Sequence, residues 1–180
     1  MTDAWKDLLA GNERFRHGES DHDRVRERER TADRHAPRVA VLSCADARVG
    51  PNLVFDTDVG DVFAVRVAGN LATPVTIASL RYAVQQLGVD TVVVLGHEDC
   101  GAVGAALADV RDPGLAALVD PIRDAVAGTT DPALAVRRNA CRQAALVHAA
   151  LGHEARVVAA TYVPATGEVL VQDPALTPAP

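Results

Sequence analysis

The sequence has few cysteines, no long apolar run and no excess of positive charge, and each gap excludes a class of protein. Three cysteines in 180 residues are an odd number, which argues against a disulfide framework and for a reducing compartment. No apolar run reaches the ~18 residues that a membrane span needs, and the polar start MTDAWKD does not resemble a signal peptide. We therefore expect a cytoplasmic protein with no membrane partner.

The charge balance excludes a further class of partner. The formal net charge is -6 and the sequence pI is near 5.4, which leaves no basic footprint for nucleic acid. What the chain does contain is apolar residues, at 48% and mostly Ala, Val and Leu. A chain of this length and composition can bury one core without disulfides. A single domain with a small-molecule substrate is expected.

Residues 1–37 predict a helical arm rather than a separate domain. Gly18 ends a helix over residues 3–16, in which these side chains recur at helical spacing: Trp5, Leu8, Leu9, Asn12 and Phe15. This apolar stripe has no neighbour in the sequence, so the helix must dock on the body of the chain or on another subunit. Residues 21–34 balance five basic against five acidic residues, which is typical of a solvated face or a short exposed helix.

Residues 38–173 alternate between strand and helix patterns. The expected strands are 38–44, 61–69, 90–96, 156–163 and 168–172, and the expected helices between them are 73–88 and 131–152. This order predicts an α/β fold of three α/β/α layers around a central, mostly parallel sheet. Four strands should be parallel, and the C-terminal edge strand antiparallel. The Pro-rich residues 174–180 predict a loose tail.

Three potential metal ligands fall at the carboxyl ends of predicted strands. Cys44 ends the first strand, and His97 and Cys100 lie just beyond the third. Ligands of open parallel sheets bind at these ends, and two sulfurs with one nitrogen suit tetrahedral Zn²⁺ with one position free. Taken singly, each residue is more often a buried cysteine or a satisfied histidine. Asp46 is the only nearby fourth ligand, so an open catalytic site and a closed structural site are both possible.

Arg48 favours the catalytic interpretation. Its guanidinium can bind the Asp46 carboxylate, two residues away, with two parallel hydrogen bonds and keep it ionised. That carboxylate could accept a hydrogen bond from a metal-bound hydroxide and direct its lone pair at an electrophile. If Arg48 released it, the carboxylate could bind the metal and expel water. An ion pair that only stabilises the turn is the alternative.

The segments CADARV, VRVAGN, SLRYAVQQLGV and GHEDCGAV, in this order and spacing, resemble the β-class carbonic anhydrases over roughly residues 5–172. The resemblance implies that Cys44, His97 and Cys100 bind one Zn²⁺ per subunit. It also implies that Asp46, partnered by Arg48, orients the bound hydroxide or becomes the fourth ligand in a closed state. The implied enzyme is a carbonate dehydratase, a zinc lyase of carbon utilisation that reversibly hydrates CO₂ to bicarbonate and a proton.

The resemblance further implies an apolar pocket for CO₂. Its expected members are Phe63, Val67, Gly69, Tyr82, Gly101 and His35. Phe63 and Tyr82 could equally be core residues, and Gly69 and Gly101 simple turn glycines. Two other functions stay open beside CO₂ hydration: hydrolysis of CS₂ or COS on the same fold, and a catalytically silent zinc-binding homologue.

The chain departs from the family pattern at three positions. His35 stands nine residues before Cys44, where the family commonly has a Gln that can hydrogen-bond bicarbonate. An imidazole can also donate a hydrogen bond or carry protons, so we expect retained but altered activity; a plain surface histidine is the alternative. Val67 replaces the Asn usual after Arg66. Members regulated by bicarbonate at a second site carry Trp where this chain has Val41, so that regulation is not expected.

Assembly is implied by the resemblance alone. Family members form dimers or dimers of dimers with the active site near the subunit boundary, so we expect a homodimer or dimer of dimers. Residues 1–37 would then form a dimer contact, and a monomer with the helix folded back is the alternative. Residues 108–135 are shorter than the family suggests. Cys141 falls within a predicted helix and is expected to be a core residue without a role.

Overall fold

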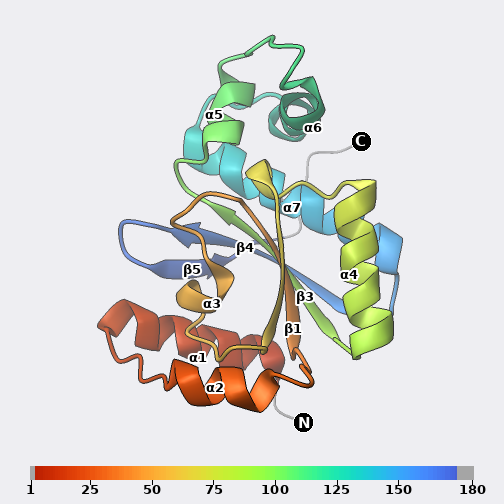
Figure 1. The fold of residues 1–180 in the computed structure, drawn as a ribbon. Coiled ribbons are helices and arrows are strands. Elements are labelled where there is room, and N and C mark those ends of the chain that lie inside the picture. Colours follow the sequence, from red (N-terminus) through yellow and green to blue (C-terminus); the bar gives the residue numbers. More distant parts are fainter. Residues whose placement is uncertain (1–2, 174–180) are drawn as a thin grey trace.

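The structure, a computed structural model, describes residues 3–173 and contains one five-stranded sheet (Figure 1). The spatial order is β2-β1-β3-β4-β5, with the first four strands parallel and β5 antiparallel to β4. The strands are β1 Val39–Ser43, β2 Val62–Arg66, β3 Thr91–His97, β4 Arg156–Val163 and β5 Glu168–Val171. This confirms the predicted fold class. The tail predicted for 174–180 lies outside the described residues.

Helices cover both faces of the sheet because the central strands are apolar on both sides. Along β1, Val39 and Val41 pack into the core beneath α1 and α3, whereas Ala40 and Leu42 pack into the core beneath α4 and α7. This alternation follows from the two-residue period of a strand. The covering helices are α1 Ala4–His17, α3 Pro51–Val54, α4 Pro74–Leu87 and α7 Pro132–Leu151.

The N-terminal helix α1 docks on the sheet of its own chain. Asp3 caps its start, and Gly18 ends it with a left-handed φ of 67°, as the sequence predicted. Trp5 packs edge-on against Phe55, with ring centroids 6.2 Å apart. The buried Asn12 donates to the Val54 and Gly167 carbonyls at 2.9 and 2.8 Å, and it accepts from Val169 N at 3.0 Å. The helix α1 therefore docks on the body of its own chain, which is one of the two predicted partners. A dimer contact stays a prediction.

The charged segment contains the short helix α2, Arg24–Thr31. Most of its side chains are exposed, as expected, but Glu27 is buried. Its carboxylate accepts from Arg24 at 2.8 Å and from the backbone of Val59 at 3.0 Å. The segment is therefore tied to the loop before β2 by an ion pair and a backbone bond.

Two short helices and a single turn lie beyond the carboxyl ends of the strands. They are α5 Gly101–Leu107, α6 Ala116–Val126 and the 3-10 turn η1 Ala68–Asn70; α5 and α6 lie together at the top of Figure 1. The strand predicted over 61–69 is too long, because Gly69 adopts φ 71° and an extended chain cannot pass through that conformation. Cys141 is buried on α7, as expected of a core residue.

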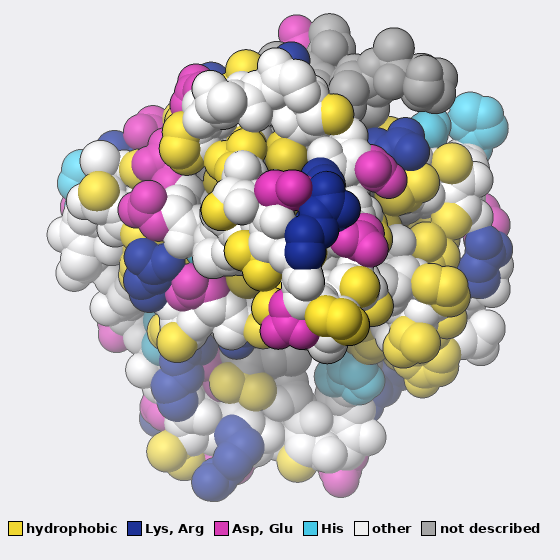
Figure 2. Space-filling model, turned by 90° about the horizontal axis from the view of Figure 1, so that it is seen from above, with side chains coloured by type: hydrophobic (Ala, Val, Ile, Leu, Met, Phe, Trp, Pro, Cys, Tyr) yellow, Lys and Arg dark blue, Asp and Glu magenta, His cyan; other side chains and the backbone are white. Residues whose placement is uncertain are grey.

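The outer surface over α5 and α6 carries charges of both signs. Seen from above, basic and acidic side chains lie next to one another among hydrophobic ones (Figure 2). Arg123 illustrates the pairing, because it contacts Asp109 at 2.9 Å and Asp120 at 2.5 Å. Within residues 3–173, no helix combines the length and apolarity needed to cross a membrane.

Candidate metal centre

The structure brings Cys44, His97 and Cys100 together at one end of the sheet. Cys44 directly follows β1, and His97 is the last residue of the neighbouring strand β3, which pairs with β1 in parallel. Cys100 caps the start of α5. One donor atom from each residue lies within 4.8 Å of the other two, and all three side chains are buried. The convergence expected from strand ends is present.

The histidine at this site is oriented to use Nε2. His97 Nδ1 lies 2.8 Å from the Glu98 carbonyl, and because a carbonyl only accepts, Nδ1 carries the proton and Nε2 has a free lone pair. Nε2 is buried and has no hydrogen-bond partner among residues 3–173. An unpaired buried nitrogen costs about 1–3 kcal/mol. A metal ligated at Nε2 would remove this cost.

The two thiols also favour a cation. Hydrogen bonding from Cys100 holds the pKa of Cys44 well below its usual value, and the same neighbouring sulfur raises the pKa of Cys100. Without a cation, one thiol ionises readily while the other resists, because two adjacent thiolates repel. A divalent ion stabilises both thiolates. The donor set therefore fits Zn²⁺, with Cys44, His97 and Cys100 as its three ligands.

Asp46 lies beside this group and is held by Arg48. Arg48 Nε and Nη2 donate to the two carboxylate oxygens at 3.0 and 2.8 Å, and the Arg48 backbone N donates at 2.9 Å. These bonds hold the pKa of the Asp46 carboxyl far below its ordinary value. Asp46 Oδ2 is 3.9 Å from His97 Nε2. Arg48 thus binds both oxygens of the carboxylate, and the choice between an open and a closed site stays a prediction.

The loop that carries Cys44 and Asp46 is braced by a residue that sequence reasoning gave no role. Arg66, at the end of β2, donates from Nε to the Cys44 carbonyl at 3.2 Å and from Nη2 to the Asp46 carbonyl at 2.7 Å. The signal in the sequence was the position of Arg66 near the end of the strand predicted over 61–69. It binds carbonyl groups, which a motif search does not reveal.

Backbone groups surround the Cys44 sulfur. Asp46 N and Gly69 N each lie 3.4 Å from Sγ and donate to it. A side chain at Gly69 would be strained, because φ is 71° and a Cβ there would lie 2.6 Å from Ile122 Cδ1. Val67 packs into the same cluster as Cys44 and Cys100. Of the predicted pocket residues, Gly69 and Val67 are therefore beside the site.

The other predicted pocket residues lie at varying distances from the metal ligands. Gly101 follows Cys100 directly and lines a cavity of about 540 Å³, whose apolar members include Val103, Leu107 and Val136. Neither Phe63 nor Tyr82 lines this cavity. Their rings pack against each other, with centroids 6.2 Å apart, and Tyr82 is 52% exposed.

His35 is not brought to the site within one chain. It precedes β1, and its Cβ lies 3.8 Å from the Cβ position built on Gly60, which precedes β2. Cys44 follows β1, at the opposite end of the same strand. The five residues of β1 separate the two ends by about 16 Å at about 3.3 Å per residue.

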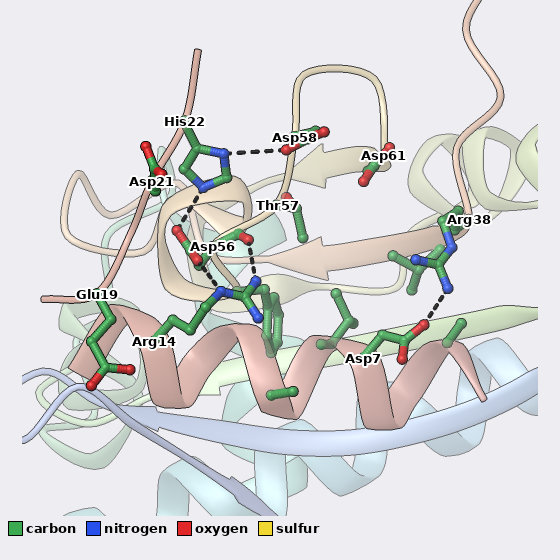
Figure 3. Close-up of a pocket in the computed structure, with 15 residues that line it drawn as sticks. Asp7, Arg14, Glu19, Asp21, His22, Arg38, Asp56, Thr57, Asp58 and Asp61 are labelled. Carbon is green, nitrogen blue, oxygen red and sulfur yellow. Dashed lines mark hydrogen bonds and ion pairs between the residues drawn. The ribbon is translucent and has the colours of Figure 1, made fainter. Parts of the chain in front are cut away.

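A second group of potential ligands lies in the arm, around His22 (Figure 3). His22 Nε2 is 2.6 Å from Asp56, while Nδ1 is 3.1 Å from Glu27 and 3.2 Å from Asp58. Each of these carboxylates also binds an arginine: Asp56 with Arg14, Glu27 with Arg24, and Asp58 with Arg30. Because the arginines already neutralise the carboxylates, we interpret the group as an ion-pair network.

This ion-pair network (the arm network) borders another cavity, of about 600 Å³, between α1 and the strand ends that lie opposite the metal centre. Six of its lining residues are acidic: Asp7, Glu19, Asp21, Asp56, Asp58 and Asp61. The cavity of about 540 Å³ lined by Cys100 adjoins the metal ligands.

This fold and this site define a class: an α/β enzyme-type domain with a Cys-His-Cys centre at the strand ends and a paired Asp and Arg beside it. The model of the carbonic anhydrase family matches residues 39–169. The chain belongs to the carbonic anhydrase family, in its β class.

Individual relatives show how far the similarity extends. Carbonic anhydrase 2 of Mycobacterium tuberculosis is 44% identical over 111 residues, which cover 61% of this chain and 54% of that protein. The carbonic anhydrase of Mycolicibacterium smegmatis is 41% identical over 106 residues, which cover 58% of this chain and 52% of that protein. The chain thus matches about half the length of these curated relatives.

Solved structures match over a greater share of the chain. The β-carbonic anhydrase of Coccomyxa, in complex with acetazolamide, superposes with a TM-score of 0.72 at 26% identity, covering 95% of this chain and 86% of that one. A β-carbonic anhydrase of Aspergillus fumigatus gives a TM-score of 0.74 at 22% identity, covering 96% of this chain and 92% of that one, and it supports the fold alone.

Proposed function

We propose that the protein is a zinc-dependent carbonate dehydratase that reversibly hydrates CO₂ to bicarbonate and a proton. One observation carries the proposal: three buried donor atoms within 4.8 Å of one another lie next to a carboxylate held by a guanidinium. Cys44, His97 and Cys100 would hold one Zn²⁺ per subunit. When bound, zinc lowers the pKa of a coordinated water and so supplies a nucleophile near neutral pH.

Asp46 and Arg48 would orient the attacking oxygen. An ionised carboxylate accepts hydrogen bonds and cannot donate them. Arg48 keeps Asp46 ionised, because it holds the pKa of the Asp46 carboxyl far below neutral. An attacking water or hydroxide that donates a hydrogen bond to Asp46 therefore directs a lone pair away from the carboxylate and toward the carbon of CO₂. The bonds from Arg48 fix the direction of the carboxylate.

CO₂ is apolar, so the substrate should lie against apolar groups. We assign Val67, Gly69 and Gly101 to the pocket, because they adjoin the ligands. Phe63, Tyr82 and His35 remain proposed members. Because His35 and Cys44 of one chain lie at opposite ends of β1, His35 would have to reach the substrate of a second copy.

A homodimer or dimer of dimers in the cytoplasm is part of the proposal. Two β-carbonic anhydrases of Sordaria macrospora, one of which superposes with a TM-score of 0.69 at 22% identity, are tetrameric. A dimer would also supply the second copy that His35 requires. Size-exclusion chromatography with light scattering measures the assembly, and a monomer at working concentration would contradict it.

Stopped-flow CO₂ hydration with a pH indicator, combined with metal analysis, tests the activity. We expect about one zinc per chain and turnover that chelation abolishes. Zinc without turnover would favour the silent homologue, and turnover only of CS₂ or COS would favour the hydrolase. A protein that binds no zinc would overturn all three.

A further inference from the structure

We propose that Asn139 is a positioning residue for the metal centre, and that it acts on the Cys44 sulfur through the backbone at Gly69. The inference rests on the zinc site of the proposed function but not on the identity of the substrate. It concerns a buried amide on α7 that does not touch the metal ligands.

A continuous set of contacts joins α7 to the sulfur. The Asn139 side chain is 1% exposed, and its Nδ2 donates to the Gly69 carbonyl at 3.0 Å. On the other side of the same glycine, the Gly69 backbone N donates to Cys44 Sγ at 3.4 Å. Asn139 therefore binds the peptide group that follows Gly69, while the peptide group that precedes Gly69 donates to the sulfur of Cys44, a proposed metal ligand.

A second buried amide fixes the orientation of the first. Gln143 lies one turn further along α7 and is also 1% exposed. Its Nε2 donates to Asn139 Oδ1 at 3.0 Å, and its Oε1 accepts from the Ala72 backbone N at 3.0 Å. Because Asn139 Oδ1 accepts from Gln143, the Asn139 amide nitrogen must face Gly69. Both ends of the segment from Gly69 to Ala72 are thus tied to α7.

Gly69 needs such an external anchor. Glycine is the most mobile residue of a backbone, and here it adopts a left-handed φ of 71°. A side chain that would restrict it is excluded by Ile122, whose Cδ1 would lie 2.6 Å from a Cβ at this position. Hydrogen bonds with α7 at the Gly69 carbonyl and the Ala72 N–H thus hold the backbone on one side of the Gly69 N–H.

The Gly69 N–H would affect the metal through the sulfur. A hydrogen bond to a thiolate is charge-assisted and withdraws electron density from the sulfur. Loss of that bond should alter the charge that Cys44 donates and loosen the position of the ligand. Contacts of this kind typically change metal affinity by about 10–100-fold when removed.

Asn139→Asp tests the proposal, because it replaces the donor to Gly69 with an acceptor of the same shape. Asn12→Asp is the matched control: Asn12 is equally buried, also donates to backbone carbonyls, and lies in α1 away from the centre. Zinc affinity is measured by chelator competition, and the thiolate-to-cobalt charge-transfer absorption by spectroscopy of the Co²⁺-substituted protein. Thermal unfolding is recorded for both variants.

We expect Asn139→Asp to bind zinc about 10-fold more weakly and to shift the cobalt band. Asn12→Asp should lose thermal stability but keep wild-type values of both metal readouts. Wild-type affinity and an unshifted band in Asn139→Asp would overturn the proposal and leave Asn139 a core residue.

If Asn139→Asp does not fold, Gln143→Glu replaces it. This variant removes the donor to Asn139 Oδ1 and should change both readouts in the same direction, by a smaller factor; no change would overturn the proposal. A wild-type chain that binds no zinc would overturn the proposed function and this inference together. Zinc-loaded wild type with unaffected variants would overturn the inference alone.

Discussion

Asp46 and Cys44 are neighbours in the sequence with different expected roles, and single substitutions separate them. Asp46→Ala should keep zinc, because the three ligands remain, but lose about 100-fold or more in turnover, because the attacking oxygen is no longer oriented. Cys44→Ala should lose zinc, because two ligands do not hold the ion. Metal analysis and stopped-flow hydration measure the two effects.

The matched control for Asp46→Ala is Asp120→Ala. Asp120 also pairs with an arginine, Arg123, but on the exposed surface of α6, where such a pair contributes at most about 1 kcal/mol. The Asp120→Ala variant should therefore keep full zinc content and turnover. Full turnover in Asp46→Ala would show that the carboxylate has no part in the reaction.

At the scale of single elements, α1 depends on one buried amide. Asn12→Ala leaves the Val54 and Gly167 carbonyls and the Val169 N–H without their partner. We expect the free energy of unfolding of the zinc-loaded protein to fall by about 2–4 kcal/mol, measured by urea denaturation. Glu13→Ala, at the next and exposed position of α1, should change it little. Equal stability of the two variants would mean that the hydrogen bonds of Asn12 contribute little to stability.

The arm network should make stability depend on pH. Burial lowers the pKa of His22, but the hydrogen bonds to Asp56 and Glu27 and the charge of Asp56 together outweigh it, and the net pKa lies above the ordinary value of 6.5. A raised pKa means that the folded state binds the proton more tightly. This contribution is therefore complete below about pH 6.5 and is lost as the pH rises through the folded pKa.

His22→Gln removes the titrating group and isolates this effect. Wild type should exceed the variant in free energy of unfolding by the largest margin near pH 5.5, and the margin should shrink toward pH 8. Urea denaturation across this range measures it. His17→Gln, an exposed histidine on α1, is the control. A margin that stays constant with pH would show that folding does not raise the pKa of His22.

The sequence predicted those elements whose ends carry a signal. α1, α4 and α7 have capping residues at their starts, Asp3, Thr73 and Asp131. Helices α5 and α6 were missed for a physical reason, because Gly101 and Gly104 are poor helix formers and Pro121 lies inside α6. Tertiary packing overrides these local preferences.

The residues of the site likewise divide into those with a signal in the sequence and those without one. The potential ligands were found because they lie at or just beyond the carboxyl ends of predicted strands. Arg66, Asn139 and Gln143 were not, because they act on backbone groups of segments distant in the sequence, and a pattern of residue types records no such partner. His35 is the converse case: the family resemblance implied a place at the substrate, but within one chain the strand β1 separates it from Cys44, so its role stays a prediction about a second copy.

At the scale of the whole molecule, the position of His35 makes the site depend on assembly. If His35 serves the substrate of a second copy, a dimer of one Asp46→Ala chain and one His35→Ala chain contains one complete site. That site combines Asp46 from the second chain with His35 from the first. The other site of the same dimer lacks both residues. Each parent variant, by contrast, has two incomplete sites.

Subunit exchange between the two variants therefore distinguishes action across the interface from action within a chain. We expect the mixed dimers, purified by two different affinity tags, to hydrate CO₂ faster than the mean of the two parents, approaching half of the wild-type rate per dimer. Mixed dimers of Asp46→Ala with Asp120→Ala set the rate for one complete site. If His35 acts within its own chain or has no role, the mixed dimers show only the mean of the parents, because no new complete site forms.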